Sequence, residues 1–415
     1  MTLLTKFDKF EDKYKIIQVY HNFVKQIKDR EKLGVKEFIG SQPLQILPKD
    51  FIGIQKNTLI TPKIDGKRHL MILTSNFIGF VDRGMNFYYP SNLKNKPFNL
   101  NELLDNDALK REVYKNLDMA LIFDCEVVEN RELLQVFIFD ILFADILHDR
   151  LLHKQVVPFY RYNFNERRKY LEYHFQLLML LESYLKNLSI KIYIKNFYKF
   201  STFKEMTYEN LIKLFNFDMN FIKKEVPEYD GAIFINVLYP YYLNPLPSYG
   251  QYKWKPKEKL TIDLKIKKDG NEWEMYSKGD KKIDIENIEL YTTNLKEEYD
   301  GKVFEFVYDG KYIRLHEPVL ERTVKGANAF MTIVSTIEAG DKFFDLKEIK
   351  LFYDVLHIEG KKFRSNWADK KTLIKLGILC DRKTLFLSSK EGELLKSKVD
   401  LFYKTPYVIE KSKEV

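Results

Sequence analysis

The segment KIDGKR contains the side chain of this chain best suited to covalent catalysis, the amine of Lys63. A lysine amine attacks an electrophile only when it is uncharged, and an ordinary pKa of about 10.4 keeps most of it protonated at neutral pH. Neighbouring cations penalise the ammonium form, so a catalytic lysine is expected to lie among other basic residues. Arg68 in the same segment, and Lys253 and Lys255 in the segment YKWKP, are the candidates for that role.

Carboxylates in two further segments complement these basic residues. Glu126 lies in FDCEVV and Asp230 lies in EYDGAIF. Magnesium binds to a few carboxylates together with phosphate oxygens, so both residues are candidates for contacts to Mg²⁺ or Mn²⁺ or to a ribose. The cations around Lys63 would in turn neutralise charge on phosphate oxygens in a transition state. Residues of these types could therefore act together on a phosphorylated substrate.

The order of the segments is more specific than any one of them. A single Lys-x-Asp-Gly string often marks a surface turn. Here KIDGKR is followed by FDCEVV, VFIFDIL, EYDGAIF, YKWKP and RTVKGAN. This series resembles motifs I, III, IIIa, IV, V and VI of the covalent nucleotidyltransferases, the superfamily of capping enzymes and of ATP- or NAD-dependent ligases. The resemblance covers residues 34–340, so it implies the fold of most of the chain.

The resemblance also implies roles for individual residues. The expected catalytic residues are the nucleophile Lys63 with Lys253, Lys255, Arg322 and Lys325. The expected nucleotide-binding residues are Asp65, Arg68, Arg83, Glu126 and Phe139, and the expected metal ligands are Asp230 and Glu126. Phe139 would stack on the purine, since every base has a π face. Strand alternation puts Phe137 on the same face, so it remains a rival for that role.

Three features favour capping enzymes over ligases. FIGSQP resembles the stretch that precedes the nucleophile strand of capping enzymes, and KWKPKEKLTIDLKI, with Ile262-Asp263, resembles their junction into an OB domain. FMTIVSTIEA, with Ile333 and Ile337, lies where that family has a helical tail. The resemblance thus implies an mRNA guanylyltransferase, closest to those of large DNA viruses or related cytoplasmic elements. Such an enzyme takes GMP from GTP, releases pyrophosphate and transfers GMP to the 5′-diphosphate end of RNA.

Two alternatives stay open, and the chain departs from the family pattern at three places, of which the minor one is Ala327, where a proline is frequent. An ATP-dependent DNA or RNA ligase would use the same lysine for adenylate transfer, and a non-catalytic scaffold of a transcription complex would keep only the fold. Cys125 replaces the usual glycine of motif III, which would cost energy if the backbone needed a positive φ. Val324 replaces the usual aspartate of motif VI, which bears on how pyrophosphate is oriented.

The expected partners follow from activities that the sequence lacks. No pair of Glu-x-Glu strands suits a metal-dependent RNA triphosphatase, and no glycine-rich loop suits S-adenosylmethionine. We therefore expect a separate RNA triphosphatase and a separate methyltransferase, besides GTP, the RNA 5′ end and an RNA polymerase complex.

Local patterns predict the elements that position these residues. Alternating apolar residues predict a hairpin from strands at 70–73 and 77–81, and further strands in LIFDCEVV, LLQVFIFDIL, GAIFI and QYKWK. A helical period predicts a helix over 167–185. Asp269-Gly270 and Asp309-Gly310 each lie between alternating strands, which is a strong hairpin signal, and a helical stretch follows at 327–338.

The predicted fold class is α+β with a change of texture near residue 258. A helical extension is expected at 1–33 and a nucleotidyltransferase domain, with ATP-grasp-like antiparallel sheets and helices, at 34–258. The hairpins at 259–340 suit an OB-fold β-barrel. Residues 341–415 contain no motif that predicts a role.

Composition limits the setting in which the protein works. The net charge of +9 suits a polyanionic partner, although a lysine-rich composition alone also produces it. Cys125 and Cys380 are the only cysteines, which argues against disulfides and for a reducing compartment. The longest apolar run, at 177–181, is too short to cross a bilayer, and the N-terminus lacks a signal peptide. We expect an intracellular, soluble protein without membrane contact, cytoplasmic or virion-associated rather than nuclear.

Overall fold

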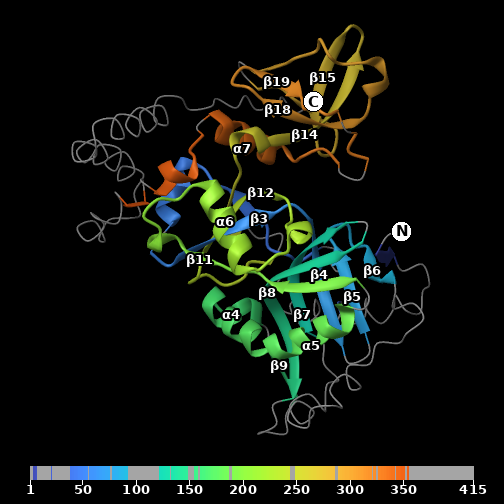
Figure 1. Cartoon of the computed structure of the whole chain (residues 1–415). Coiled ribbons are helices and arrows are strands. Elements are labelled where there is room, and N and C mark those ends of the chain that lie inside the picture. Colours follow the sequence, from blue (N-terminus) through green and yellow to red (C-terminus); the bar gives the residue numbers. More distant parts are fainter. Residues whose placement is uncertain are drawn as a thin grey trace. The chain divides into compact units, whose positions relative to one another are not determined.

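The structure is a computed structural model of the whole chain (Figure 1). It describes residues 3–6, 20, 38–54, 56–74, 77–91, 121–130, 132–147, 154–157, 159–186, 189–243, 248–285, 288–319, 321–323, 326–341, 343–350 and 353–354. The chain divides into two compact units. The first comprises Met1–Leu44, Asn57–Thr202 and Glu209–Tyr252, and the second comprises Gln45–Lys56, Phe203–Tyr208 and Lys253–Val415. Within the described ranges, no helix is long and apolar enough to span a membrane.

The larger sheet of the first unit has the strand order β1-β6-β5-β4-β7-β8-β10, with β9 paired to β8. In chain order its strands are β1 (Leu4–Lys6), β4 (Lys67–Thr74), β5 (Phe77–Asp82), β6 (Phe87–Pro90), β7 (Leu121–Glu129), β8 (Leu134–Leu147), β9 (Lys154–Val157) and β10 (Ile190–Ile194). Strands β8 and β10 are parallel, whereas the other neighbours are antiparallel. The hairpin predicted for 70–81 is confirmed, because β4 and β5 pair antiparallel.

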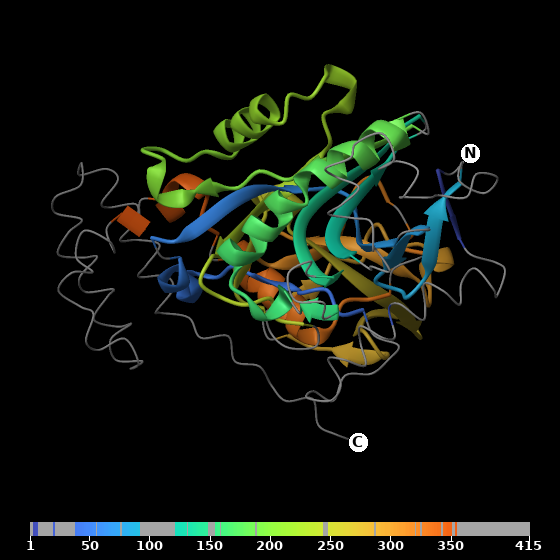
Figure 2. The same cartoon turned by 90° about the horizontal axis from the view of Figure 1, so that it is seen from below.

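The central strand β4 is buried on both faces, which explains its run of apolar residues. Successive side chains of a strand point to opposite faces. Met71 and Leu73 accordingly belong to one apolar core, and Leu70 and Ile72 to another. The first core is covered by the helices α4 (Phe164–Tyr173) and α5 (Phe175–Lys186), which lie across one face of the sheet (Figure 1, Figure 2).

A second sheet carries Lys63. Its order is β11-β3-β12-β13-β2. Its strands are β2 (Pro43–Gln45), β3 (Thr58–Ile64), β11 (Tyr198–Lys199), β12 (Tyr229–Asn236) and β13 (Ser248–Trp254). The strands predicted in GAIFI and QYKWK are therefore β12 and β13. The remaining helical elements up to this point are η1 (Pro48–Gly53), η3 (Phe159–Arg161), η4 (Phe200–Thr202), α6 (Tyr208–Asp218) and η5 (Lys223–Glu225).

The second unit contains a sheet of order β16-β15-β14-β18-β19-β17. Its strands are β14 (Thr261–Asp269), β15 (Glu272–Ser277), β16 (Lys281–Ile283), β17 (Glu289–Leu290), β18 (Val303–Tyr308) and β19 (Tyr312–Leu315), with η6 (Lys257–Lys259), η7 (Glu297–Tyr299) and α7 (Phe330–Asp341). Both predicted hairpins are confirmed: β14 pairs with β15 and β18 with β19. Gly270 and Gly310 have φ of +60° and +107° in the two turns, which explains the glycines. The predicted helix is α7, and its Ile333 and Ile337 lie in the apolar core of this sheet.

Two predicted helical segments differ from the structure. Residues 4–6, inside the predicted N-terminal helix, form strand β1, which pairs with the edge strand β6. Most of the rest of residues 1–33 lies outside the described residues. The single helix predicted for 167–185 is two helices, because α4 ends at Tyr173 and α5 begins at Phe175, with His174 between them. The apolar period alone did not mark that break.

Candidate functional site

Lys63 and Asp230 form an ion pair across two neighbouring strands. Lys63 lies on β3 opposite Gly231 of β12, and the register shifts between Tyr229 and Gly231. This irregularity leaves Asp230 between two paired residues, and its Oδ2 accepts a hydrogen bond from Lys63 Nζ at 2.5 Å. The side chains of Lys63 and Asp230 are 27% and 14% exposed, so the ion pair is partly buried but still reaches solvent. The structure thus joins the predicted nucleophile to a predicted metal ligand.

Glu126 lies beside this pair on β7. Burial raises the pKa of Glu126, while the positive charges of Lys63, Arg68, Lys195 and Arg83 act in the opposite direction. Four cations thus lie within electrostatic range of one buried carboxylate. Such a group of perturbed titratable side chains is typical of a functional site.

Gly66 explains why the KxDG segment needs a glycine. A Cβ atom built on Gly66 would lie 2.8 Å from Cγ of Glu126 and 2.8 Å from the carbonyl oxygen of Val127. Real Cβ atoms do not approach that closely, so the reason is close packing rather than an unusual φ. The absence of a side chain at residue 66 lets the β3–β4 connection pass directly over the Glu126 side chain.

Lys195 is a member of this site that sequence reasoning missed. It follows β10 directly, its N–H donates to the carbonyl oxygen of Ile138 at 2.8 Å, and it is only 5% exposed. Burial lowers the pKa of Lys195 to about 7; Glu126 raises it and Lys63 lowers it further. No motif marks this residue. The only signal in the sequence is that this lysine directly follows the apolar strand IKIYI. Burial at such a position disfavours the charged form of a lysine.

The structure distinguishes between the two candidate aromatic residues. Phe137 is fully buried and stacks on Tyr193, with ring centroids 4.9 Å apart and planes at 12°. Phe139 is half-buried, and the guanidinium of Arg68 and the Nζ of Lys195 lie 5.4 and 5.9 Å from its ring centroid. Phe139 therefore lies beside the charged group, whereas Phe137 is part of the core.

A bulge in β8 produces this placement. Ile138 pairs with Cys125 and Asp140 pairs with Asp124. Because Cys125 and Asp124 are adjacent on β7, Phe139 is an extra residue of β8 that has no pairing partner on β7. Asp140 then accepts hydrogen bonds from Arg167 of α4 at 2.8 and 2.9 Å in a buried ion pair. The helix α4 thus holds the strand next to the bulge. Bulges commonly re-aim side chains in this way.

Arg68 is buried in a network of hydrogen bonds. Its Nε and Nη2 donate to Asp124, its Nη2 also donates to the Tyr241 hydroxyl at 3.0 Å, and its Nη1 donates to the carbonyl oxygen of Ser41. Burial alone would lower the pKa of Arg68, but Asp124 and Tyr241 raise it above the ordinary value. Arg68 therefore braces β4, β7 and the FIGSQP segment. Its expected contact with ribose or phosphate stays a prediction.

The motif III cysteine causes no backbone strain. Cys125 lies within the regular strand β7, and positive φ values of non-glycine residues in the described ranges occur elsewhere. Its thiol is buried, and its Sγ lies 3.4 Å from the carbonyl oxygen of His69. Burial raises the pKa of Cys125, so the thiol is held protonated. The cost expected if this position needed a glycine conformation does not arise.

Two other predicted nucleotide-binding residues lie at the edge of the site. Arg83 is exposed between β5 and β6 and is near enough to Arg68 and Glu126 to interact with their charges. The Asp65 side chain is also exposed, and its backbone N–H donates to the carbonyl oxygen of Glu228 at 2.8 Å. Arg83 is thus within electrostatic range of the group, while only the backbone of Asp65 has a described role.

The other predicted catalytic residues belong to the second unit. Lys253 and Lys255 flank the buried Trp254 and are half-buried themselves. Arg322 donates to Asp263 at 2.8 Å and lies 3.5 Å from Glu305. The Ile262-Asp263 step therefore holds the motif VI arginine. Lys325 and Val324 lie outside the described residues.

The carboxylates near Lys63 suit a metal ion that takes few protein ligands. Among the described residues, no group of three or more His, Cys, Asp or Glu side chains could enclose a metal ion. Magnesium commonly uses one or two carboxylates, with phosphate oxygens and waters completing its octahedron. Asp230 and Glu126 meet that requirement, since both are carboxylates next to Lys63. They fit a metal that arrives with a phosphate and not a closed protein cage.

Comparison with known proteins finds solved structures that resemble this chain with low TM-scores. No family model matches the chain, and no curated protein matches it. The ATP-dependent DNA ligase from bacteriophage T7, in complex with ATP, is 14% identical, with 65% of this chain and 93% of that chain covered and a TM-score of 0.33. A mycobacterial DNA ligase D complexed with ATP and MES is 13% identical (69% and 98% covered, TM-score 0.33). The Chlorella virus DNA ligase-adenylate is 12% identical (68% and 99% covered, TM-score 0.28). TM-scores of this size do not establish a shared fold.

Proposed function

We propose that this chain is a covalent nucleotidyltransferase whose nucleophile is Lys63. The observation that carries the proposal is the Lys63–Asp230 pair, with the Glu126 charge beside it. In the reaction, Lys63 Nζ attacks the α-phosphorus of a nucleoside triphosphate. A phosphorus–nitrogen bond forms, the bond from the α-phosphorus to the bridging oxygen breaks, and pyrophosphate leaves with that oxygen. The ammonium group of Lys63 loses one proton before the attack and a second as the phosphorus–nitrogen bond forms, and both pass to water.

The site residues of the first unit each have a role in this proposal. Lys63 Nζ donates to Asp230, so this contact must open before the amine attacks, and a divalent metal on Asp230 would compete for the same carboxylate. Phe139 offers a half-buried ring for the base. Lys253, Lys255, Arg322 and Lys325 of the second unit would neutralise the phosphate oxygens.

The nucleotide is GTP and the acceptor is the 5′-diphosphate end of RNA, which makes the enzyme an mRNA guanylyltransferase of the capping type. Support comes from the sequence resemblance at FIGSQP and KWKPKEKLTIDLKI, and two contacts agree with it. Ser41 of the first segment accepts from Arg68, and Asp263 of the second accepts from Arg322. The sheet of residues 259–340 is the proposed OB domain, and Mg²⁺ or Mn²⁺ the proposed metal. An ATP-dependent ligase is the alternative with the same lysine chemistry.

The test is covalent labelling of the protein with α-³²P-labelled GTP or ATP, followed by denaturing electrophoresis. We expect acid-labile label from GTP in the wild type and none in Lys63→Ala. Lys67→Ala is the matched control, because Lys67 is an exposed lysine of the same segment, and it should label normally. Chase with 5′-diphosphate RNA should then move the label to RNA.

Three results would contradict parts of the proposal. If only ATP labels the protein, and the labelled AMP is transferred to nicked DNA or RNA, the protein is a ligase and not a capping enzyme. Label that persists in Lys63→Ala would assign the nucleophile elsewhere. The complete absence of label from every nucleotide, with a folded protein, would support a non-catalytic module.

A further inference from the structure

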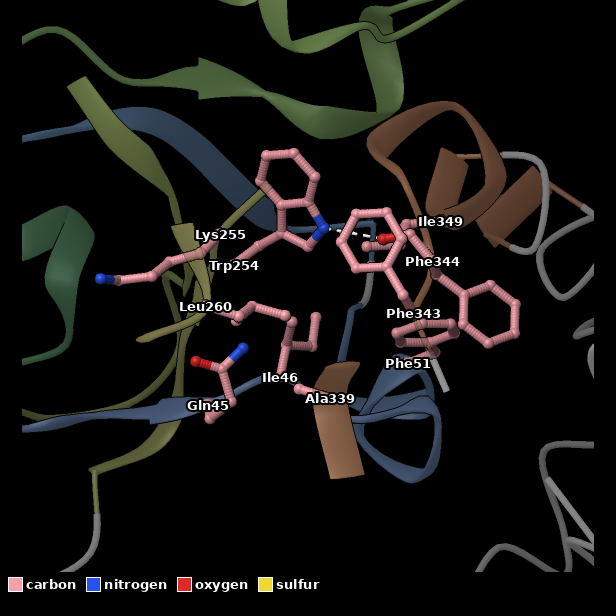
Figure 3. A pocket seen from close by; sticks show the side chains of 10 residues that line it. All are labelled: Gln45, Ile46, Phe51, Trp254, Lys255, Leu260, Ala339, Phe343, Phe344 and Ile349. Atoms are coloured by element: carbon pink, nitrogen blue, oxygen red, sulfur yellow. Dashed lines mark hydrogen bonds between the residues drawn. The ribbon is translucent and has the colours of Figure 1, made fainter. Parts of the chain in front are cut away.

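Trp254 separates the two lysines of the YKWKP segment from the interior of the second unit. Successive side chains of a strand alternate in direction, and Trp254 is 5% exposed whereas Lys253 and Lys255 are half-buried. Figure 3 shows the indole and the Lys255 side chain pointing away from one another. Strand β13 ends at Trp254, and Pro256 has no N–H with which to continue a ladder. Trp254 is therefore the buried residue that ends the strand, and Lys255 follows it directly.

The anchor of Trp254 is the segment that follows α7. The indole N–H donates to the carbonyl oxygen of Phe344 at 2.7 Å (Figure 3). The ring of Phe343 lies 6.1 Å from the indole, and Tyr208 contacts the indole edge-on at 5.4 Å. The ring of Phe344 meets Phe51 at 5.1 Å and 89°. Aromatic contacts and one buried hydrogen bond thus hold the strand end against this segment.

The docked segment is itself held in place. Asp345 and Glu348 form a reciprocal capping box, each backbone N–H donating to the other side chain at 2.8 Å. Leu346 and Ile349 behind it are each 1% exposed. On the other side of the strand end, the N–H of Ile46 donates to the carbonyl oxygen of Lys253 at 2.9 Å. The pocket of Figure 3 is lined in part by these elements, and Lys255 is among its lining residues.

We propose that Trp254 is a positioning residue, and that residues 343–350 act through it to hold Lys253 and Lys255 in the geometry that the reaction needs. This inference rests on the proposed function. It also assigns a role to the first part of a segment that contains no sequence motif. The lysine side chains are long and have many rotamers, so their usefulness depends on a backbone that does not move.

The experiment compares Trp254→Phe with the matched control Trp273→Phe in the full chain. Phenylalanine keeps an aromatic ring but cannot donate to Phe344. Trp273 lies on β15 of the same unit and packs against its apolar core, so the control reproduces the chemical change elsewhere. We expect Trp254→Phe to slow formation of the Lys63 adduct about fivefold to tenfold at saturating GTP, as expected for one net hydrogen bond. The KM for GTP should change less than twofold, and Trp273→Phe should label at the wild-type rate.

A double-mutant cycle with Lys255→Ala separates positioning from general damage. If Trp254 acts through Lys255, Trp254→Phe should have less than a twofold effect once Lys255 is alanine. An equal effect in both backgrounds would overturn the inference, as would a wild-type rate in Trp254→Phe. If Trp254→Phe does not fold, Phe344→Leu takes its place in the same cycle.

A separate readout keeps this inference distinct from the proposed function. Hydrogen exchange of the backbone amides of residues 253–255 should accelerate about fivefold to tenfold in Trp254→Phe and remain unchanged in Trp273→Phe. A wild type that forms no adduct would reject the proposed function. If hydrogen exchange in Trp254→Phe were also unchanged from the wild type, the role of Trp254 in holding the strand end would be rejected as well. An active wild type with a fully active Trp254→Phe rejects the positioning role alone.

Discussion

Protonation of His174 should destabilise the fold at mildly acidic pH. The residue lies where α4 ends and α5 begins, its side chain is 1% exposed, and the described residues supply no hydrogen-bond partner for either ring nitrogen. Burial lowers the pKa of His174 from 6.5 to about 4. The folded protein therefore holds a neutral ring over a pH range in which an exposed histidine takes up a proton.

The size and sign of the effect follow from proton linkage. One pKa unit corresponds to about 1.4 kcal/mol, so the full effect approaches 3.4 kcal/mol. Because the folded pKa is the lower one, the unfolded chain binds more protons between pH 6.5 and about 4, and stability falls as the pH falls through that window. Between pH 7 and pH 5 the expected loss from this one side chain is about 2 kcal/mol.

The measurement is urea unfolding of the wild type and His174→Met at pH 7 and pH 5. Methionine fills a similar space and does not titrate, so other buried groups contribute equally to both proteins. The free energy of unfolding should fall by about 2 kcal/mol more in the wild type than in the variant. Equal losses in the two proteins would refute the reasoning and indicate that the ring is solvated or hydrogen-bonded.

Four substitutions in the first unit test the candidate site. Gly66→Ala should reduce adduct formation at least tenfold, because the new Cβ would displace Glu126. It should also lower the free energy of unfolding in urea by about 2 kcal/mol. Normal labelling would contradict the close packing of Gly66 against Glu126. Arg68→Lys should cost about 3 kcal/mol of stability, and unchanged stability would contradict the buried network; a raised KM for nucleotide would support the predicted contact with ribose or phosphate. Phe139→Leu should raise the KM about tenfold, as expected for loss of base stacking, and Phe137→Leu should mainly lower the melting temperature; the reverse pattern would exchange their roles.

Local sequence signals were sufficient for the elements that depend on short-range physics. The turns at Asp269-Gly270 and Asp309-Gly310 need positive φ, which glycine adopts without a steric penalty, so the pattern identified both hairpins. The apolar period also identified the helical region around 167–185. It did not identify the break at His174, since a histidine at that position continues an acceptable helical pattern.

The site depended on longer-range information. The segments around Lys63 and Asp230 were both selected from the sequence, but only the pairing of β3 with β12 brings the two charges to 2.5 Å. Lys195 was missed because its importance comes from burial and from neighbours on β3 and β7, which no local pattern encodes.

The sequence by itself determined which residue types could perform covalent catalysis and where the three predicted hairpins lie, because both depend on side-chain chemistry and backbone preferences within a few residues. Only the tertiary structure decided that Phe139 rather than Phe137 lies beside the charges, through the bulge in β8. It also decided that Arg68 is enclosed by Asp124, Tyr241 and Ser41. Burial and electrostatic environment are set by strands far apart in the chain, so they exist only once those strands have packed together.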